Sequence, residues 1–393
     1  MNISEGISGL KYNRKSLSYR KFNWVMLTIA FSPVLSLGLV NLAVDPYGVI
    51  STPTIAKFNQ SKPEILTQER MYKAVEITRL KPQIILLGSS RTQWGIYPQH
   101  PGLSKSNLKA YNVGFSGANM YEVMRYFKHA IANQPDLKTV VIGLDFFMFR
   151  EHNPPASDFR ESRLEITSIH PQDLINSLFS VDALIASQKT ITKNISLSYP
   201  NYQIYNGFFI NDYRKPLPGS SQAFAKWIKP AFNAYRNYKL SPQNLNHLKN
   251  IIQVCQQKGI DVKVFISPSH AIEAEAIQIV GSWEQFEQWK RELVKITPVW
   301  DFSGYNSITG ESIKTEMKNY TDNSHYRKEV GDLILNRLFD SNTEKVPNDF
   351  GILLTPKNIQ SHLAKIRADR EFWAKNNPND VKLMQNLKLN LYK

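Results

Sequence analysis

The chain has 393 residues, and 42% of them are hydrophobic, so a sizeable folded core is expected and global disorder is not. The net charge of +15 favours an anionic partner or a negatively charged membrane surface. Because no zinc-finger spacing or RNA-binding aromatic signature accompanies this charge, we expect no nucleic acid partner. The one cysteine, Cys255, excludes an internal disulfide, and its place on an apolar helical face predicts a buried thiol rather than a nucleophile.

The beginning of the chain predicts a membrane anchor. Residues 1–22 are basic, and residues 23–44 contain no charged side chain. That length matches the roughly 20 residues that an α-helix needs to cross a bilayer core, so we predict a transmembrane anchor over 23–45. The alternative is a cleaved signal peptide with a poor cleavage site at 36–38. An anchor with a basic flank places 1–22 in the cytoplasm and everything after Asp45 in the periplasm, on the outer side of the inner membrane.

The chain after the anchor alternates short apolar runs with segments of helical period. A turn at Val44–Gly48 and a helix-compatible stretch at Lys62–Leu80 precede four expected strands, at Ile84–Leu87, Thr139–Leu144, Asp261–Pro268 and Pro298–Phe302. Expected helices cover 120–131, 243–258 and 330–338, and a further one opens at Ser282 with a capping box to Gln285. Strands that alternate with helices form a parallel sheet covered on both faces. We therefore predict an α/β three-layer sandwich built from 60–150 and 241–340.

The turn after the first expected strand is Gly88-Ser89-Ser90. In doubly wound sheets the functional residues collect just beyond the carboxyl ends of the strands, so a serine at this turn can present its hydroxyl to a crevice. The alternative is a βα turn whose serines only cap the following helix. The stretch matches neither form of glycine-rich nucleotide loop.

Two further motifs suit the chemistry of a reactive serine. "YTDNSHY" at 320–326 places Asp322 three residues before His325, where the carboxylate can hold the imidazole in one tautomer and leave Nε2 facing a serine. "YNVGFSGAN" at 111–119 contains Gly117, whose backbone N–H can approach a developing oxyanion. The alternative for the first motif is a helix cap beside an unrelated surface histidine. The alternative for the second motif is a flexible turn. His270, after the third expected strand, is the substitute base if His325 is remote.

Together the three motifs resemble those of the SGNH hydrolase superfamily, the GDSL-like esterases, whose blocks occur in the same order. The resemblance spans about residues 80–340 and rests on short motifs. It implies an SGNH/flavodoxin-like fold in which Ser90 is the nucleophile, His325 the base and Asp322 its partner. It also implies an oxyanion hole formed by the N–H groups of Ser90 and Gly117.

Two positions depart from that family pattern. Ser89 stands where the family has an aspartate, and Phe146 and Phe147 stand where an asparagine completes the oxyanion hole. A missing donor costs about 3–4 kcal/mol of transition-state stabilisation. Asn119 and Arg91 are therefore further candidate donors.

The anchor and the Gly-Ser-Ser block are also similar to those of membrane-anchored polysaccharide O-acetylation proteins and of the D-alanyl transfer protein of teichoic-acid modification. That similarity implies extracytoplasmic transfer of an acyl group, usually acetyl, to a cell-envelope polysaccharide or another anionic envelope polymer. It also implies a multispanning membrane-bound O-acyltransferase as partner, and no cofactor. The alternative function is a non-catalytic scaffold that binds the polymer or the membrane partner.

The segment 151–240 is too long for one strand–helix connection, and we expect it to be an insertion over the site. It interleaves aromatic side chains, which pack on sugar rings, with cations, which bind anionic groups. The candidate substrate-binding residues are Tyr205, Tyr213, Arg214, Lys215 and Trp227. A small subdomain with an aromatic core and a basic surface is the alternative. Residues 341–393 form a helical extension that packs on the domain or lies near the anionic membrane face. No histidine pair has metal-binding helical spacing, so we expect no metal site.

Overall fold

A computed structural model of the chain describes residues 12–104, 108–196, 203–210, 221–314 and 316–391. The chain divides into two compact units, Met1–Leu66 with His170–Tyr199, and Thr67–Ile169 with Pro200–Lys393. The segment 151–240, which the sequence suggested as one insertion, is therefore shared between the two units.

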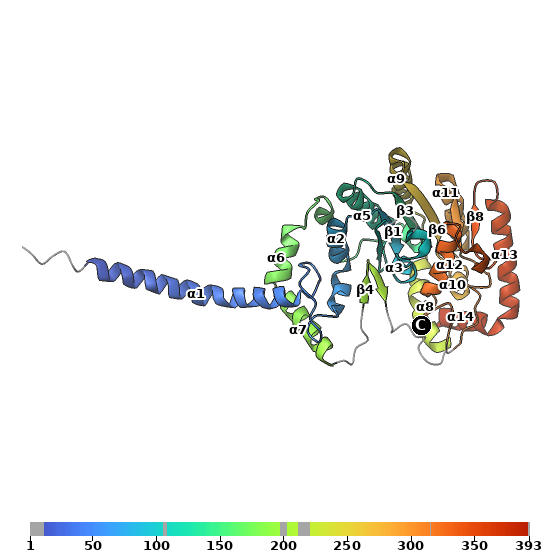
Figure 1. Ribbon diagram of the computed structural model, residues 1–393. Coiled ribbons are helices and arrows are strands. Elements are labelled where there is room, and N and C mark those ends of the chain that lie inside the picture. Colours follow the sequence, from blue (N-terminus) through green and yellow to red (C-terminus); the bar gives the residue numbers. More distant parts are fainter. Residues whose placement is uncertain (1–11, 105–107, 197–202, 211–220, 315, 392–393) are drawn as a thin grey trace, which may run out of the picture. The chain divides into compact units, whose positions relative to one another are not determined.

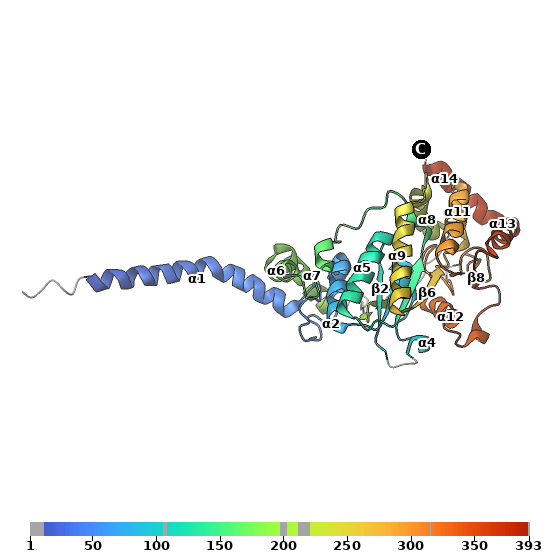
Figure 2. The same cartoon turned by 90° about the horizontal axis from the view of Figure 1, so that it is seen from above.

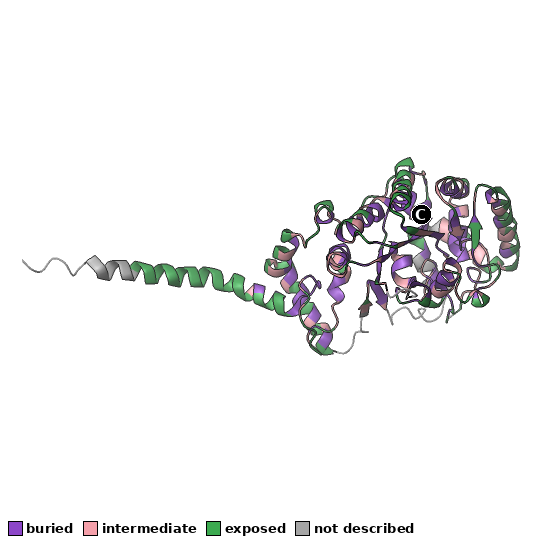
Figure 3. Cartoon of the chain, turned by 45° about the horizontal axis from the view of Figure 1, so that its top comes forward, coloured by how far each residue is buried: buried purple, intermediate pink, exposed green. Residues whose placement is uncertain are grey.

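In its described residues, the first unit contains one long α-helix and two shorter ones. They are α1 (Tyr12–Val44), α6 (Pro171–Phe179) and α7 (Val181–Ser196). The part of α1 from Tyr19 to Val44 is long and apolar enough to cross a membrane, with a mean hydropathy of 1.9. Only 11% of its apolar window is buried, and Figure 3 shows most of the helix surface exposed, so α1 is not a core helix. By length and composition it is a candidate membrane anchor.

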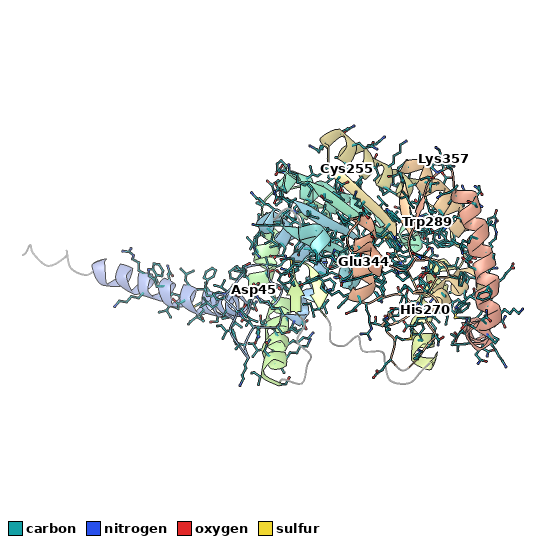
Figure 4. All side chains as sticks on the ribbon, turned by 45° about the vertical axis from the view of Figure 1, so that its right-hand side comes forward. Asp45, Cys255, His270, Trp289, Glu344 and Lys357 are labelled. Atoms are coloured by element: carbon teal, nitrogen blue, oxygen red, sulfur yellow. The ribbon has the colours of Figure 1, made fainter. Side chains whose placement is uncertain are left out.

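The predicted turn at Val44–Gly48 ends α1. Asp45 has φ +48°, in the left-handed region that aspartate tolerates. Its carboxylate accepts the N–H groups of Ile50 and Ser51 at 3.1 and 3.0 Å and forms an ion pair with Lys62 at 2.9 Å. The turn is thus held by its own carboxylate, which is labelled in Figure 4.

The second unit is built on a six-stranded sheet with the order β2-β1-β3-β6-β7-β8. Its parallel strands are β1 (Ile84–Ser89), β2 (Ala110–Phe115), β3 (Thr139–Leu144), β6 (Asp261–Ile266) and β7 (Val299–Asp301). The edge strand β8 (Ile352–Leu354), which the sequence did not suggest, is antiparallel to β7. The prediction of an α/β fold is confirmed, and the sheet, predicted to be parallel, is parallel except for its edge strand β8.

Helices cover both faces of this sheet (Figures 1 and 2). One face carries α5 (Met120–Asn133), α9 (Pro242–Lys258) and α11 (Trp283–Ile296) side by side. The other carries α3 (Ser90–Gly95) and α12 (Lys328–Leu338), which contact each other. The unit also contains α2 (Glu69–Leu80), α4 (Pro101–Ser104), α8 (Ser221–Tyr235), α10 (Ala271–Ile279), α13 (Ile359–Asn376), α14 (Pro378–Leu391), and the hairpin of β4 (Gln203–Tyr205) and β5 (Phe208–Ile210). Short 3₁₀ helices are η1 (Pro63–Gln68), which spans the boundary between the units, η2 (Phe146–Phe149), η3 (Glu161–Leu164) and η5 (Thr343–Lys345).

The core of the second unit lies between the sheet and its helices. Every residue of β1 and β2 is buried, and Trp289 of α11, labelled in Figure 4, is fully buried against Phe146 and Phe149. Continuous apolar strands are typical of parallel sheets covered on both faces. The apolar runs of the sequence are therefore explained by burial.

The expected capping box at the start of α11 is wrong. Ser282 makes no side-chain cap, because its hydroxyl donates instead to the carbonyl oxygen of Tyr235 at 2.6 Å. A capping box is present at α5, where Asn119 and Glu122 bond reciprocally. A tertiary partner has thus overridden the local sequence pattern at Ser282.

The C-terminal extension, residues 341–393, packs on the rest of the second unit. In α13, Nε2 of His362 lies 2.8 Å from the carboxylate of Asp301, at the end of β7. In α14, Lys388 donates to the carbonyl oxygen of Ile279 at 2.7 Å. Of the two placements expected for 341–393, packing on the domain is the one observed.

Asp301 is the buried centre of that attachment and yields a stability prediction. It is fully buried 2.6 Å from Nζ of Lys290, itself fully buried. We expect Lys290→Met to lower the free energy of unfolding by about 3–5 kcal/mol, because it leaves a buried carboxylate without its cation. The matched control Lys295→Met removes an exposed pair with Glu292 and should cost less than about 1 kcal/mol. Urea unfolding followed by tryptophan fluorescence measures both, and equal losses would contradict the prediction.

Candidate active site

The candidate site lies where the connections through the sheet reverse direction. The chain passes from β1 to β2 on one side and then from β2 to β3 on the other side of β1. Ligands of open α/β sheets bind at such a switch point, beyond the carboxyl ends of the strands. Ser90 follows β1 directly, and Asp145 follows β3. Both residues therefore lie at the point of the fold best suited to a functional site.

A glycine permits the sharp turn from β1 into α3. Gly88 has φ +154°, and a Cβ there would lie 2.1 Å from Oγ1 of Thr92 and 2.9 Å from the carbonyl oxygen of Gly143. Ser89 then caps the helix, its Oγ accepting the N–H of Arg91 at 3.1 Å. The partly exposed Ser90 begins α3, so its own N–H belongs to the first turn, where N–H groups have no partner within the helix.

Ser90 is hydrogen-bonded to His325, although 235 residues separate them in the chain. Its Oγ lies 2.9 Å from Nε2 of the imidazole, and Nδ1 lies 2.9 Å from the carboxylate of Asp322. Because an ionised carboxylate only accepts, it assigns the imidazole proton to Nδ1 and leaves Nε2 to accept from the serine. The structure thus brings together the three residues that the sequence suggested for catalysis.

The loop that carries His325 is held by its own backbone. Asp322 Oδ1 accepts the N–H groups of Ser324 and His325 at 2.8 Å each, and Thr321 N–H donates to the carbonyl oxygen of His325 at 3.0 Å. The loop leads into α12, where a Cβ on Gly331 would lie 1.8 Å from the carbonyl oxygen of Gly95 in α3. This close approach of α12 to α3 brings the histidine to the serine.

A buried charge cluster, which the sequence did not indicate, flanks the serine. Nη1 of Arg91 donates to Asp145 at 2.9 Å, and its Nη2 donates to Glu273 in α10. The hydroxyl of Ser89 donates to the second oxygen of Asp145. The three charged side chains are at most 4% exposed, so each depends on the others for its solvation.

The same cluster also contacts the histidine loop. Nε and Nη2 of Arg91 donate to Oγ of Ser324 at 3.1 and 3.0 Å, and the amide of Asn323 donates to Glu273 at 3.1 Å. Arg91, next to the serine, and Asn323, next to His325, therefore share the carboxylate of Glu273. The cluster sets the position of both catalytic candidates.

The protonation states of the cluster are fixed by its contacts. Burial lowers the pKa of Arg91, but Glu273 and Asp145 more than offset this and raise the pKa above its ordinary value. Burial and the adjacent Glu273 also raise the pKa of Tyr235, whose hydroxyl donates to that carboxylate. Arg91 therefore stays charged, and Tyr235 stays neutral, at neutral pH.

The candidate oxyanion donors are the backbone N–H groups of Ser90 and Gly117 and the side chains of Asn119 and Arg91. Gly117 is exposed, has φ +63° and has open space around it, and it follows β2, whose Phe115 pairs with Ser89. Asn119 is not free to serve, because its oxygen accepts the N–H of Glu122 and its amide donates to the carbonyl oxygen of Asn153.

Arg91, the other side-chain candidate, is held by two carboxylates and Ser324. The donors left with suitable surroundings are the backbone N–H groups of Ser90 and Gly117.

A pocket of about 270 Å³ borders the histidine. Arg91, Glu273 and His325 supply polar lining, and apolar lining comes from Phe147 and, in α8, from Pro230, Ala231 and Ala234. The pocket is large enough for a small acyl group or part of a sugar. Since α8 belongs to the segment 151–240, one part of the expected insertion borders the site.

Of the candidate substrate-binding residues, the structure describes the side chain of Tyr205 alone. Tyr205, at the end of β4, is 37% exposed, packs against Tyr97 and accepts a hydrogen bond from Gln99; it does not line the pocket. Trp227 lies in α8, but its side chain is outside what the structure describes. Tyr213, Arg214 and Lys215 lie outside the described residues.

His270 does not serve as the substitute base. Its Nδ1 accepts the N–H of Ile272 at the start of α10, and its Nε2 lies 2.6 Å from the carbonyl oxygen of Glu311. Burial lowers its pKa to about 4, so the ring is neutral and both nitrogens are occupied. The residue, labelled in Figure 4, is a buried helix cap.

Other chemistry finds little support in the part of the chain that the structure describes. There, no three His, Cys, Asp or Glu side chains are grouped so as to hold a metal ion. Cys255 is fully buried in α9, and burial raises the pKa of its thiol to about 12. A thiol with such a pKa is not a nucleophile at neutral pH.

Comparison of the chain with models of known protein families gave no match, and comparison with curated proteins gave none. The site itself holds a hydroxyl, an imidazole and a carboxylate in a hydrogen-bonded line, an arrangement that can activate a serine.

The charge cluster predicts that Glu273 orders the histidine loop. Glu273→Gln should speed amide hydrogen exchange in residues 320–326, because it removes one of the two charges that hold Arg91 and weakens the bond to Asn323. The matched control is Glu275→Gln, on the same helix, whose carboxylate pairs with Arg370 instead. Equal exchange in the loop for both variants would show that the cluster does not position it.

His270 predicts a pH dependence of stability. The unfolded state takes up a proton as the pH falls through 6.5, whereas the folded state resists until about pH 4, so stability falls as the pH decreases between these values. The fall attributable to His270 is about 3 kcal/mol. His270→Asn keeps a capping side chain but has no imidazole to titrate. The free energy of unfolding of this variant should therefore lack that part of the fall, and any other difference from the wild type should not depend on pH. Urea unfolding at pH 4.5 and 7 tests this, with the exposed His152→Asn as a control that keeps the wild-type slope.

Proposed function

We propose that the chain is a membrane-anchored serine O-acyltransferase or esterase that acts on a cell-envelope polysaccharide. The observation that carries the proposal is the hydrogen-bonded line from Asp322 through His325 to the hydroxyl of Ser90, with 2.9 Å at each step. The alternative role for the turn, helix capping, belongs to Ser89 and leaves the hydroxyl of Ser90 available.

In the proposed reaction, Nε2 of His325 takes the hydroxyl proton while Oγ of Ser90 bonds to the carbonyl carbon of an ester donor. The tetrahedral intermediate collapses with cleavage of its bond to the leaving oxygen, which receives the proton from His325. A polysaccharide hydroxyl or water then gives its proton to His325 and attacks the acyl-serine. The bond from the acyl carbon to Oγ of Ser90 breaks, Oγ takes the proton back from His325, and the acylated polymer or the free acid leaves. Asp322 selects the imidazole tautomer and stabilises the imidazolium formed in each half.

The oxyanion of both intermediates is assigned to the backbone N–H groups of Ser90 and Gly117. The open space at Gly117 suits the approach of a substrate carbonyl, and a first-turn N–H such as that of Ser90 is an anion donor. The absence of an asparagine after β3 leaves the hole with fewer donors than in the family that the motifs resemble. That favours transfer from a reactive donor over hydrolysis of unactivated esters.

We further propose that the second unit is an SGNH-like domain. The order of the three motifs supports this, as does the position of Ser90 and Asp145 at the β1/β3 switch point. The N-terminal part of the chain supports the membrane setting of the proposal. The uncharged run 23–44 of α1 is preceded by Lys11, Arg14, Lys15, Arg20 and Lys21. This favours a cytoplasmic N-terminus and a periplasmic domain, with a multispanning O-acyltransferase supplying the acyl group.

A non-catalytic scaffold is the second candidate. The missing asparagine and the engagement of Asn119 and Arg91 elsewhere favour it, since neither side chain replaces the lost donor. Such a scaffold would bind the polymer or the membrane partner without forming an acyl-serine.

A fluorophosphonate probe separates the two candidates, because it labels only an activated serine. The wild-type chain in membranes should be labelled, and Ser90→Ala should abolish labelling and acyl transfer. Asp322→Asn should lower turnover by about 10⁴-fold through loss of the imidazole tautomer. The exposed Ser361→Ala is the matched control and should behave as wild type. Labelling of Ser90→Ala at the wild-type level would leave the scaffold as the better account.

A further inference from the structure

The first unit carries an exposed apolar surface on α6 and α7, which we call the α6–α7 surface. Ile175 and Phe179 are four residues apart on α6, and Val181 and Ile185 are four residues apart on α7, so each pair shares a helix face. These four side chains and Ile195 are 45–64% exposed. Exposed apolar side chains that share helix faces in this way indicate a surface with a partner.

The α6–α7 surface is fixed to the apolar part of α1. The fully buried Asn41 donates to the carbonyl oxygen of Leu178 at 2.9 Å and accepts from the hydroxyl of Ser187 at 2.8 Å. Gly38 lies against the ring of Phe179, where a Cβ would be 2.6 Å from a ring carbon. Both α1 residues belong to the uncharged run that ends at Val44.

These contacts indicate how deep the α6–α7 surface lies along α1 and which side of it faces the apolar run. Gly38 precedes Val44 by six residues, which is about 9 Å along a helix and matches the 5–10 Å to which interfacial helices sink below a membrane surface. Phe179 contacts α1 on the N-terminal side of Asn41, toward the apolar run. Asp182 lies on the opposite side, close to Tyr47 beyond the end of α1, where its charge adds to burial in raising the pKa of that tyrosine.

We propose that α6 and α7 are interfacial helices that lie in the boundary between headgroups and acyl chains of the bilayer crossed by α1. Figure 1 shows both helices crossing the end of α1, the orientation that a helix in the membrane plane requires. The partner is the lipid itself, because the surface is continuous with the apolar surface of the candidate span. The chain then contacts the membrane through a span and a flat apolar surface, which limits tilting of the first unit.

The test uses the full chain in phospholipid nanodiscs whose lipids carry a quencher on the acyl chain. Phe179→Cys and Ile185→Cys, made in a Cys255→Ala background, are labelled with an environment-sensitive fluorophore. Both labels should show blue-shifted emission and lose fluorescence to the quencher. The matched control is Asp182→Cys, between them in the sequence but on the aqueous side, and it should show neither effect.

Quenching of the two labels no stronger than that of the Asp182→Cys label would overturn the proposal. Disulfide cross-linking between two Phe179→Cys chains would also overturn it, because it would show that a second copy covers the surface. A further variant, Ile185→Asp, gives an independent readout, since it adds a charge at the apolar surface, whereas its matched control Ile185→Leu keeps the surface apolar. Labelled Phe179→Cys should lose its quenching in the Ile185→Asp chain and keep it in the Ile185→Leu chain.

Discussion

The buried charge of Arg91 is the constraint on which the rest of the candidate site depends. An unpaired charge in a protein interior costs several kcal/mol, so a fold that buries this guanidinium must place acceptors around it. Asp145 at the end of β3 and Glu273 in α10 provide them. These carboxylates come from separate elements. The carboxyl end of β3, α3 and α10 must therefore take one relative arrangement for both carboxylates to reach Arg91. Through Ser324 the same requirement extends to the histidine loop.

This arrangement also divides the tasks of a reactive site between side chains and backbone. Arg91 holds the structure together and is thereby withdrawn from direct contact with a developing oxyanion, which leaves that task to backbone N–H groups. The same contacts hold the loop of His325 through Ser324 and Asn323. The cluster therefore accounts for the position of the base, whereas in the proposed reaction Asp322 stabilises the imidazolium formed when Ser90 loses its proton.

The sequence predicted what depends on local pattern and missed what depends on distant contacts. Apolar runs identified the strands before Ser90 and Asp145, and the Asp-x-x-His spacing placed Asp322 behind its imidazole. Glu273 escaped notice because an acid on a helix looks like a solvated surface residue, and its partner Arg91 is 182 residues away in the chain. His270 was a candidate base in the sequence because no local pattern reveals that its ring is buried as the cap of α10.

The segment 151–240 shows the same limit at a larger scale. Its amphipathic helices have equivalent sequence patterns, because an apolar face looks alike whether it packs on protein or on lipid. Only the neighbours distinguish them: α8 contributes Pro230 and Ala231 to the pocket lining, whereas α6 and α7 attach to α1 through Asn41 and leave their apolar residues exposed. What composition presented as one aromatic and basic insertion is therefore two structures with different surroundings. The candidate substrate-binding residues, from Tyr205 to Trp227, therefore belong to the second unit, whereas α6 and α7 belong to the first unit with α1.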